Sequence, residues 1–327
     1  MQDFTGIIGQ GGIINYLQNA ISTGKISHAY ILHGEEGMGK KTFATLFSKT
    51  LQCMEKDTHP CNKCKSCLQS DSSNQPDILW ITHEKASIGV DDIRTQVNAD
   101  IHIRPYQSQY KIYIIDSAEK MTESAQNALL KTIEEPPEYA IILLLVSSTQ
   151  QLLPTILSRC VVLDLKPIQK QLIKEHLMTN YQIPDYKAEL AASFSGGNIG
   201  KAIRYASSED FERKKEEILH ILRYIDEMEL HEIISGIKTI SKNKASVSDY
   251  IDIMLLWFRD VLMLKATKDP NLLLFKDEFQ TIKNQANLRS YDKIENIIKS
   301  MEEAKAKLKA NVNFDITIEL MLLSCLK

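Results

Sequence analysis

The segment 30–42 (YILHGEEGMGKKT) constrains the fold of this chain more than any other. Three apolar residues lead into a glycine-rich stretch in which Gly34, Gly39 and Lys40 fit the phosphate-binding pattern G-x-x-x-x-G-K. Gly37 adds a further glycine. Such glycines let successive backbone N–H groups curl around a phosphate, and the helix that follows adds partial positive charge. The segment therefore predicts a strand, a phosphate loop and a helix, with the Lys40 ammonium reaching the outer phosphates of a nucleotide.

The metal-binding position of this loop departs from the pattern. In an active loop the residue after the lysine is Ser or Thr, whose hydroxyl holds Mg²⁺. Here that residue is Lys41. Thr42 follows, but one residue further along a helix points about 100° away. We expect a loop that cradles phosphate with an impaired Mg²⁺ site, and the sequence leaves open whether ATP binds there.

A second nucleotide motif has also lost a catalytic position. The segment 111–116 (KIYIID) is an apolar strand that ends in Asp116, the acid that holds Mg²⁺ in proteins of this type. ATPases usually place Glu next, to orient the attacking water, and this chain has Ser117. The alternative is a strand that simply ends in Asp. Together with Lys41, Ser117 favours a fold that is kept for a structural or regulatory role after its chemistry has lapsed.

Composition limits how this protein can contact nucleic acid and membranes. With 39 basic and 42 acidic residues, the net charge is −3, which argues against a protein that grips nucleic acid alone. The longest apolar run, 140–146, is too short to span a bilayer. The first residues lack the basic region and apolar core of a signal peptide. We expect a cytoplasmic protein with no membrane contact.

Four of the six cysteines crowd into a short insertion. They are Cys53, Cys61, Cys64 and Cys67, with the last three separated by two-residue gaps. Four thiolates form a closed tetrahedral Zn²⁺ site with no position left for substrate, so the expected metal is structural. The alternative is four unconnected thiols. The roles of Cys160 and Cys325 stay open, with burial as small apolar residues as the default.

The order of apolar segments predicts the fold class. Strand-like runs follow the first strand at 77–82, 111–116, 140–147 and 160–165. The last three are nearly continuous apolar runs, which is typical of strands buried on both faces of a parallel sheet. Helical segments lie between them, so we expect a doubly wound α/β domain over residues 1–166, with the zinc module at 53–67. Residues 167–207 then predict a small helical lid, and residues 208–327 an all-α domain.

Three further segments carry a family resemblance. They are 125–137 (AQNALLKTIEEPP), 147–149 (SST) and 158–160 (SRC). With the two nucleotide motifs and the zinc module, they make the chain resemble the AAA+ subunits of the bacterial sliding-clamp loader of DNA polymerase III. The resemblance is specific in residues 28–165 and only architectural beyond about residue 207. It implies that residues 208–327 form an oligomerising collar.

The resemblance also implies roles for single residues. Arg159 of the Ser-Arg-Cys triplet would be an arginine finger that reaches the γ-phosphate bound by a neighbouring ATPase subunit. Without the resemblance, it is one exposed arginine among many. Thr149 falls at the first sensor position, where the alternative is a polar strand end. Lys201 falls near the second sensor position, where the alternative is a lysine that faces solvent.

The function implied by the resemblance is that of a non-hydrolysing subunit. The chain would assemble with the delta and gamma/tau subunits and support ATP-dependent loading of the sliding clamp onto primed DNA. It would have no catalysis of its own and would belong to a DNA-directed DNA polymerase, a nucleotidyltransferase, only through the assembly. Two alternatives remain: an ATP-hydrolysing gamma/tau-type subunit, and a zinc-bearing AAA+ adaptor outside replication.

Overall fold

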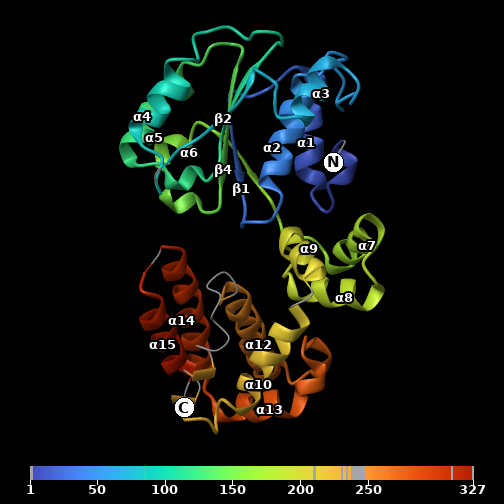
Figure 1. The fold of residues 1–327 in the computed structure, drawn as a ribbon, viewed down its shortest axis with the longest axis vertical. Helices are drawn as coiled ribbons and strands as arrows, with labels where there is room; N and C mark the ends of the chain where they lie inside the picture. The colour runs from blue at the N-terminus through green and yellow to red at the C-terminus, as the bar shows by residue number, and fades with distance from the viewer. Residues whose placement is uncertain are drawn as a thin grey trace. The chain divides into compact units, whose positions relative to one another are not determined.

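A computed structural model describes residues 3–84, 86–208, 211–229, 231–232, 235–236, 247–310 and 312–325. The chain divides into two compact units, Met1–Arg204 and Tyr205–Lys327 (Figure 1). Among the described residues, no helix combines the length and apolar character needed to cross a bilayer.

The first unit is built around a sheet of five parallel strands in the order β2-β3-β4-β1-β5. The strands are β1 (Ala29–His33), β2 (Ile78–Ile81), β3 (Lys111–Ile115), β4 (Ala140–Val146) and β5 (Val161–Asp164). Strand β4 lies in the middle and is buried along its whole length, which explains its unbroken apolar sequence. The expected parallel five-stranded sheet is confirmed.

Helices cover both faces of this sheet (Figure 1). One face carries α1 (Gly11–Thr23), α2 (Lys40–Leu51) and α3 (Lys65–Asp71), and the other carries α4 (Val90–Ile93), α5 (Glu123–Glu134) and α6 (Pro154–Leu157). Because side chains alternate across a strand, Leu143 of β4 packs in the cluster with Phe43 of α2, and Ile142 packs in the cluster with Leu129 of α5. The two faces thus have separate apolar cores.

Short helical turns lie before or between the strands and helices of the first unit, and a side-chain cap marks the start of α5. The turns are η1 (Phe4–Gly6), η2 (Arg94–Asn98), η3 (Ala118–Lys120) and η4 (Thr149–Gln151). Thr122 precedes α5, and its hydroxyl accepts a hydrogen bond from the backbone N–H of Ala125 at 3.2 Å. The helix ends at Glu134, two residues before Pro136, as a proline requires.

Three helices follow the sheet in the range expected for the lid. They are α7 (Lys170–Tyr181), α8 (Asp185–Phe194) and α9 (Ile199–Ser207). The two compact units divide inside α9, after Arg204. The division therefore groups α7 and α8 with the sheet, and the lid at 167–207 as a separate domain stays a prediction.

All the regular secondary structure in the described residues of the second unit is helical. Its helices are α10 (Phe211–Tyr224), α12 (Val247–Thr267), α13 (Phe279–Leu288), α14 (Tyr291–Lys309) and α15 (Phe314–Cys325), with the turns η6 (Pro270–Leu272) and η7 (Lys276–Glu278). Trp257 of α12 is fully buried and donates to Gln285 Oε1 at 2.8 Å. The buried Asp260 carboxylate accepts the backbone N–H groups of Leu274 and Phe275 at 2.6 and 2.9 Å. The core of this unit therefore centres on α12.

Candidate functional site

The glycine-rich segment forms the predicted turn from β1 into α2. Gly37 and Gly39 have φ angles of +90° and +97°, in the left-handed region that favours glycine. Gly39 is the N-cap of α2, so the helix begins at Lys40. The sequence therefore places the lysine on the first turn of the helix, at the carboxyl edge of the parallel sheet.

Lys40 is nearly buried and is held by oxygen atoms of the protein. Its ammonium donates to the carbonyl oxygens of Gly34 and Glu35 at 2.5 and 3.0 Å. It also donates to Ser147 Oγ, at the end of β4, at 3.3 Å. Sequence reasoning gave Ser147 no role at this site, although Ser147 belongs to the segment 147–149 that carries the family resemblance. Thr149, the expected sensor residue, begins the turn η4 two residues later, and its role stays a prediction.

Lys41 and Asp116 form an ion pair, although they lie on different elements. Lys41 Nζ is 2.8 Å from Asp116 Oδ2, at the end of β3. Thr42 is half-buried at the next position of α2. In a working site the residue after the phosphate-loop lysine and this acid hold the same Mg²⁺ ion. An ammonium does not coordinate metal, and here it also neutralises the acid, so these residues do not fit Mg²⁺.

The start of α9 is hydrogen-bonded to the phosphate loop. Asn198 Nδ2 donates to the carbonyl oxygen of Glu36 at 2.8 Å, and the backbone N–H of Gly200 donates to that of Gly37 at 2.9 Å. Asn198 Oδ1 accepts from the backbone N–H of Lys201 at 3.1 Å, which is an N-cap arrangement. Asn198 was missed as a site residue, although a Gly-Gly-Asn sequence before a helix is a recognisable cap.

Lys201 also faces the loop. Its Nζ lies 3.6 Å from Glu35 Oε2, and the lysine side chain is only 21% exposed. A lysine that merely faces solvent would be more exposed, so this geometry weakens the simpler alternative. Lys40 and Lys201 thus each contact residues of the glycine loop, while Lys41 pairs with Asp116, directly after β3.

Gly200→Ala is expected to disturb this contact between loop and helix. An added Cβ would lie 2.7 Å from both Cα and the carbonyl oxygen of Gly37. Because both atoms are backbone, we expect the free energy of unfolding of the first unit to fall by about 1–3 kcal/mol. Urea unfolding followed by circular dichroism measures the loss, and amide exchange across 195–204 should become faster.

The matched control is Gly12→Ala, in α1, where an added Cβ meets no other atom within 4 Å. Alanine favours the helix there, so this variant should be as stable as the parent or slightly more stable. Equal destabilisation by the two variants would contradict a specific contact between the loop and α9.

Arg159 lies between α6 and β5 and contacts residues of its own neighbourhood. Its Nε is 2.9 Å from Glu134 Oε1, and the two side chains are 40% and 45% exposed. A second guanidinium nitrogen donates to the carbonyl oxygen of Thr155 at 3.1 Å and to Ser158 Oγ at 3.3 Å. The guanidinium is thus oriented but still accessible to another molecule. Sequence reasoning missed Glu134 as its partner.

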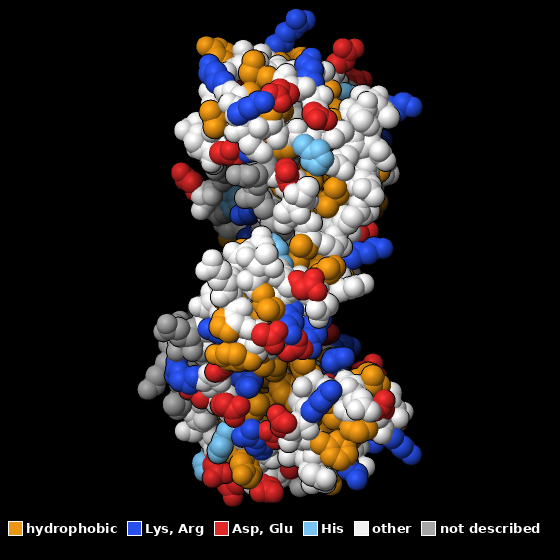
Figure 2. All heavy atoms as spheres, turned by 90° about the vertical axis from the view of Figure 1, so that its right-hand side faces the viewer, with side chains coloured by type: hydrophobic (Ala, Val, Ile, Leu, Met, Phe, Trp, Pro, Cys, Tyr) orange, Lys and Arg blue, Asp and Glu red, His pale blue; other side chains and the backbone are white. Residues whose placement is uncertain are grey.

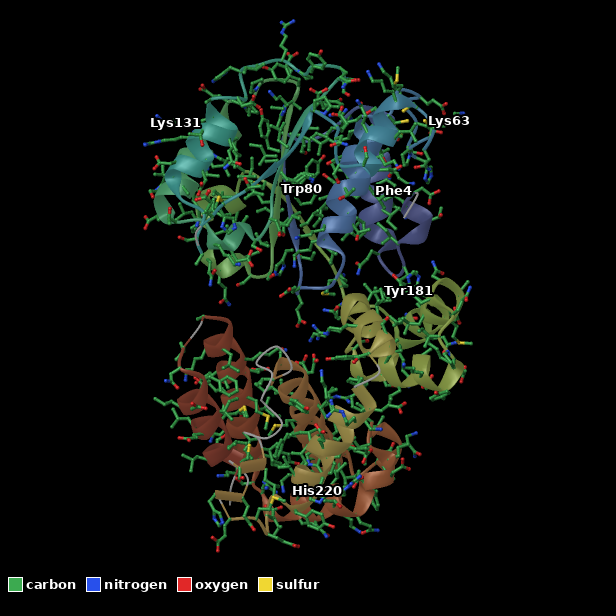
Figure 3. The ribbon with its side chains drawn as sticks, in the orientation of Figure 1. Phe4, Lys63, Trp80, Lys131, Tyr181 and His220 are labelled. Atoms are coloured by element: carbon green, nitrogen blue, oxygen red, sulfur yellow. The ribbon has the colours of Figure 1, made fainter. Side chains whose placement is uncertain are left out.

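The four clustered cysteines come together as predicted. Their sulfur atoms all lie within 4.8 Å of one another, and all six cysteines of the chain are free thiols. Cys53 follows α2, Cys64 is the N-cap of α3, and Cys67 lies inside α3. Figure 3 shows sulfur atoms close to Lys63, at the α3 side of the unit. Four thiols in this arrangement can bind a metal ion and leave no open position.

Backbone N–H groups point at these sulfur atoms. The N–H groups of Cys61, Cys64 and Cys67 donate to Cys53 Sγ, Cys61 Sγ and Cys64 Sγ at 3.3, 3.3 and 3.4 Å. Burial raises the pKa of Cys53 and of Cys67. Burial also acts to raise the pKa of Cys64, but hydrogen bonds from the N–H groups of Met54 and Cys67 and from the side chains of Cys67 and Cys61 together outweigh it and lower that pKa to about 7. The N–H groups thus favour the thiolate that a metal requires.

The two remaining cysteines lie elsewhere. Burial raises the pKa of Cys160 and of Cys325 to about 12. Cys160 packs against the apolar core that contains α5, and Cys325 is fully buried in the second unit. Both thiols are therefore protonated at neutral pH, and their surroundings fit the default of small apolar residues.

Two family profiles match this chain. The one described as "DNA polymerase III, delta subunit" matches residues 9–169, and the one described as "DNA polymerase III, delta subunit, C terminal" matches residues 211–327. The first profile matches residues of the first compact unit, and the second profile matches residues of the second unit.

Curated relatives agree with these profiles. DNA polymerase III subunit delta' of Bacillus subtilis is 29% identical over 317 residues, which covers 96% of this chain and 95% of that protein. DNA polymerase III subunit tau of the same organism is 27% identical and covers 97% of this chain, but only 61% of tau is matched. The tau/gamma subunit of Haemophilus influenzae is 36% identical over 185 residues, or 55% of this chain and 27% of that protein.

Solved structures resemble the chain loosely. A DNA polymerase III gamma subunit-related protein from Thermotoga maritima is 21% identical with a TM-score of 0.44, covering 95% of this chain and 97% of that one. The RuvB Holliday junction branch migration motor of the same organism is 17% identical with a TM-score of 0.45, covering 88% and 90%. Likeness at this level is too loose to carry an inference about function.

Proposed function

The chain belongs to the DNA polymerase III delta subunit family, and from this premise we propose that it acts as the delta prime subunit of a clamp loader. In this role it hydrolyses no ATP itself. It supplies Arg159 to the ATP site of a neighbouring subunit and so supports loading of the sliding clamp onto primed DNA.

The observation that carries the non-hydrolysing role is the ion pair between Lys41 and Asp116, at 2.8 Å. Hydrolysis requires Mg²⁺ between these two positions, because the metal neutralises charge that develops on the phosphates. Ser117, in place of the glutamate that orients water, supports the same role. Gly34 and Lys40 keep the pattern of an active loop, and Lys40 donates hydrogen bonds to the carbonyl oxygens of Gly34 and Glu35.

The proposed role of Arg159 follows from its chemistry and position. A guanidinium neutralises charge on a transferred phosphoryl group and is always protonated. The ion pair with Glu134 and the contact with Thr155 orient this side chain, while its exposure leaves it free to reach a partner. Thr149 and Lys201 are proposed as sensor residues, and the position of Lys201 against the loop supports its assignment.

We also propose roles for the domains of the chain, for its metal and for its contact with DNA. Residues 1–166 act as the AAA+ domain, 167–207 as the lid, and 208–327 as the collar that joins the delta and gamma/tau subunits. Zn²⁺ is proposed as the structural metal of the four-cysteine cluster. Acidic and basic side chains are interspersed over the face drawn in Figure 2, which supports DNA contact shared across an assembly.

One alternative has an observation in its favour. The similarity to tau extends over 97% of this chain, which suits an ATP-hydrolysing gamma/tau-type subunit. The geometry at Lys41 and Asp116 argues against that activity. Both family profiles describe subunits of a DNA polymerase, which argues against a zinc-bearing adaptor outside replication.

The isolated chain is expected to hydrolyse ATP no faster than its Lys40→Ala variant. Lys40 is the residue that an active phosphate loop cannot lose, so this variant defines the background of contaminating ATPases. Phosphate release is measured for both proteins with Mg²⁺ and primed DNA. Turnover that disappears in Lys40→Ala would favour the gamma/tau-type motor. Failure to assemble with delta and gamma/tau subunits would revive the adaptor.

A further inference from the structure

The cation beside Asp116 is part of the chain itself. Lys41 stands at the position whose hydroxyl would bind Mg²⁺, and its Nζ lies 2.8 Å from Asp116 Oδ2, the second ligand position. The ammonium therefore occupies the neighbourhood of the metal and not merely its sequence position. These residues are 75 positions apart and are brought together only because β3 and the start of α2 meet at one edge of the sheet.

The ion pair has consequences for charge more than for stability. The Lys41 and Asp116 side chains are 67% and 33% exposed, and exposed pairs contribute little to folding. Their effect on a divalent ion is larger, because Mg²⁺ at Asp116 would meet a fixed positive charge and an acid that is already paired. Mg²⁺ also prefers oxygen ligands, and Lys41 offers none.

The neighbouring positive groups remain directed at the loop. Lys40 is bonded to Gly34, Glu35 and Ser147, and Lys201 lies beside Glu35. The loop thus keeps its lysine and its glycine turn, while the Mg²⁺-binding position directly after the lysine is altered. The change is local.

We propose that Lys41 is a built-in counter-cation for Asp116 that excludes Mg²⁺ from the phosphate loop. A nucleotide or other polyphosphate that reaches the loop is then bound without a metal ion. Replacing Lys41 with threonine restores a hydroxyl, releases Asp116 and creates Mg²⁺-dependent nucleotide binding. This inference rests on the proposed non-hydrolysing role and names the residue responsible for it.

The test measures binding of a fluorescent ATP derivative to the full chain, once with Mg²⁺ and once with EDTA. The wild-type chain is expected to bind no more tightly with Mg²⁺ than with EDTA. Lys41→Thr is expected to bind at least about tenfold more tightly with Mg²⁺, because the metal bridges phosphate and protein. The double variant Lys41→Thr/Asp116→Asn should lose this gain.

The matched control is Lys120→Thr, which removes one exposed positive charge four residues after Asp116. It should behave as the wild type does. Because Lys41 is exposed, Lys41→Thr should fold normally, and a thermal melt checks this. Mg²⁺-enhanced binding by the wild type would overturn the inference, and so would the lack of any Mg²⁺ effect in Lys41→Thr.

Failure of this inference is separable from failure of the proposed function. If Lys41→Thr shows no Mg²⁺ effect, this inference fails. The proposed function still stands in that case, because the isolated wild-type chain still hydrolyses no ATP and Arg159 can still act on a neighbouring subunit. Mg²⁺-dependent ATP hydrolysis by the wild-type chain would contradict both this inference and the proposed non-hydrolysing role.

Discussion

Arg159→Ala is expected to slow ATP hydrolysis at the neighbouring subunit's site by about 10³–10⁵-fold, the range known for arginine fingers in GTPases. The reason is that the guanidinium neutralises charge that appears only as the phosphoryl group transfers, and alanine supplies no replacement. Nucleotide binding by the neighbour should change far less. In an assembly with several ATP sites, only the site next to this chain should be affected.

Single-turnover hydrolysis by an assembly of this chain with delta and gamma/tau subunits measures the effect. The amplitude of the fast phase should fall by one site for each copy of this chain. Glu134→Gln is the control, because it removes the 2.9 Å ion pair but keeps the guanidinium. Loss of the fast phase in both variants would indicate disturbed local structure, and an unchanged fast phase in Arg159→Ala would make Arg159 a surface residue.

Removing the metal from the four-cysteine cluster is expected to lower the Tm of the first unit by about 8–16 °C. Metal at a thousandfold excess over its Kd stabilises a fold by about 4 kcal/mol. In a domain of about 150–250 residues, the class that includes Met1–Arg204, 1 kcal/mol shifts Tm by about 2–4 °C. The loss should come from the segment 53–71, which the cluster ties to the end of α2.

Cys64→Ser is the sharpest variant for this prediction. Serine is a good N-cap, so the start of α3 is preserved while one metal ligand is weakened. Atomic spectroscopy should find one zinc per chain in the wild type and much less in this variant. The control is Cys160→Ser, outside the cluster, which should keep its zinc. If the wild-type protein contains no metal and its Tm does not change when a chelator is added, the metal site is contradicted.

Local sequence patterns predicted much of the fold because their causes are local. The glycines of the phosphate loop and the two-residue gaps of the cysteine cluster act within a few residues of chain. The unbroken apolar sequence of β4 is longer in range, since it needs both faces of the sheet covered. The pattern is nevertheless visible in the sequence of that one strand.

Contacts between distant segments were not predictable in this way. The pairing of Glu134 with Arg159, and the hydrogen bond from Asn198 to Glu36, join residues 25 and 162 positions apart. Single-sequence periodicity states which face of an element is apolar, but not which polar side chains meet at its ends. The contacts of Asn198 and Glu134 could therefore not be predicted from the sequence.

The sequence by itself determined that this chain has a phosphate loop, a four-cysteine cluster and a lysine where a metal-binding hydroxyl belongs. Only the tertiary structure decided what that lysine does. The strand order β2-β3-β4-β1-β5 brings the end of β3 and the start of α2 to one edge of the sheet. An ion pair depends on the distance between two charged atoms. The packing of the sheet places the two residues close enough for Lys41 Nζ and Asp116 Oδ2 to lie 2.8 Å apart.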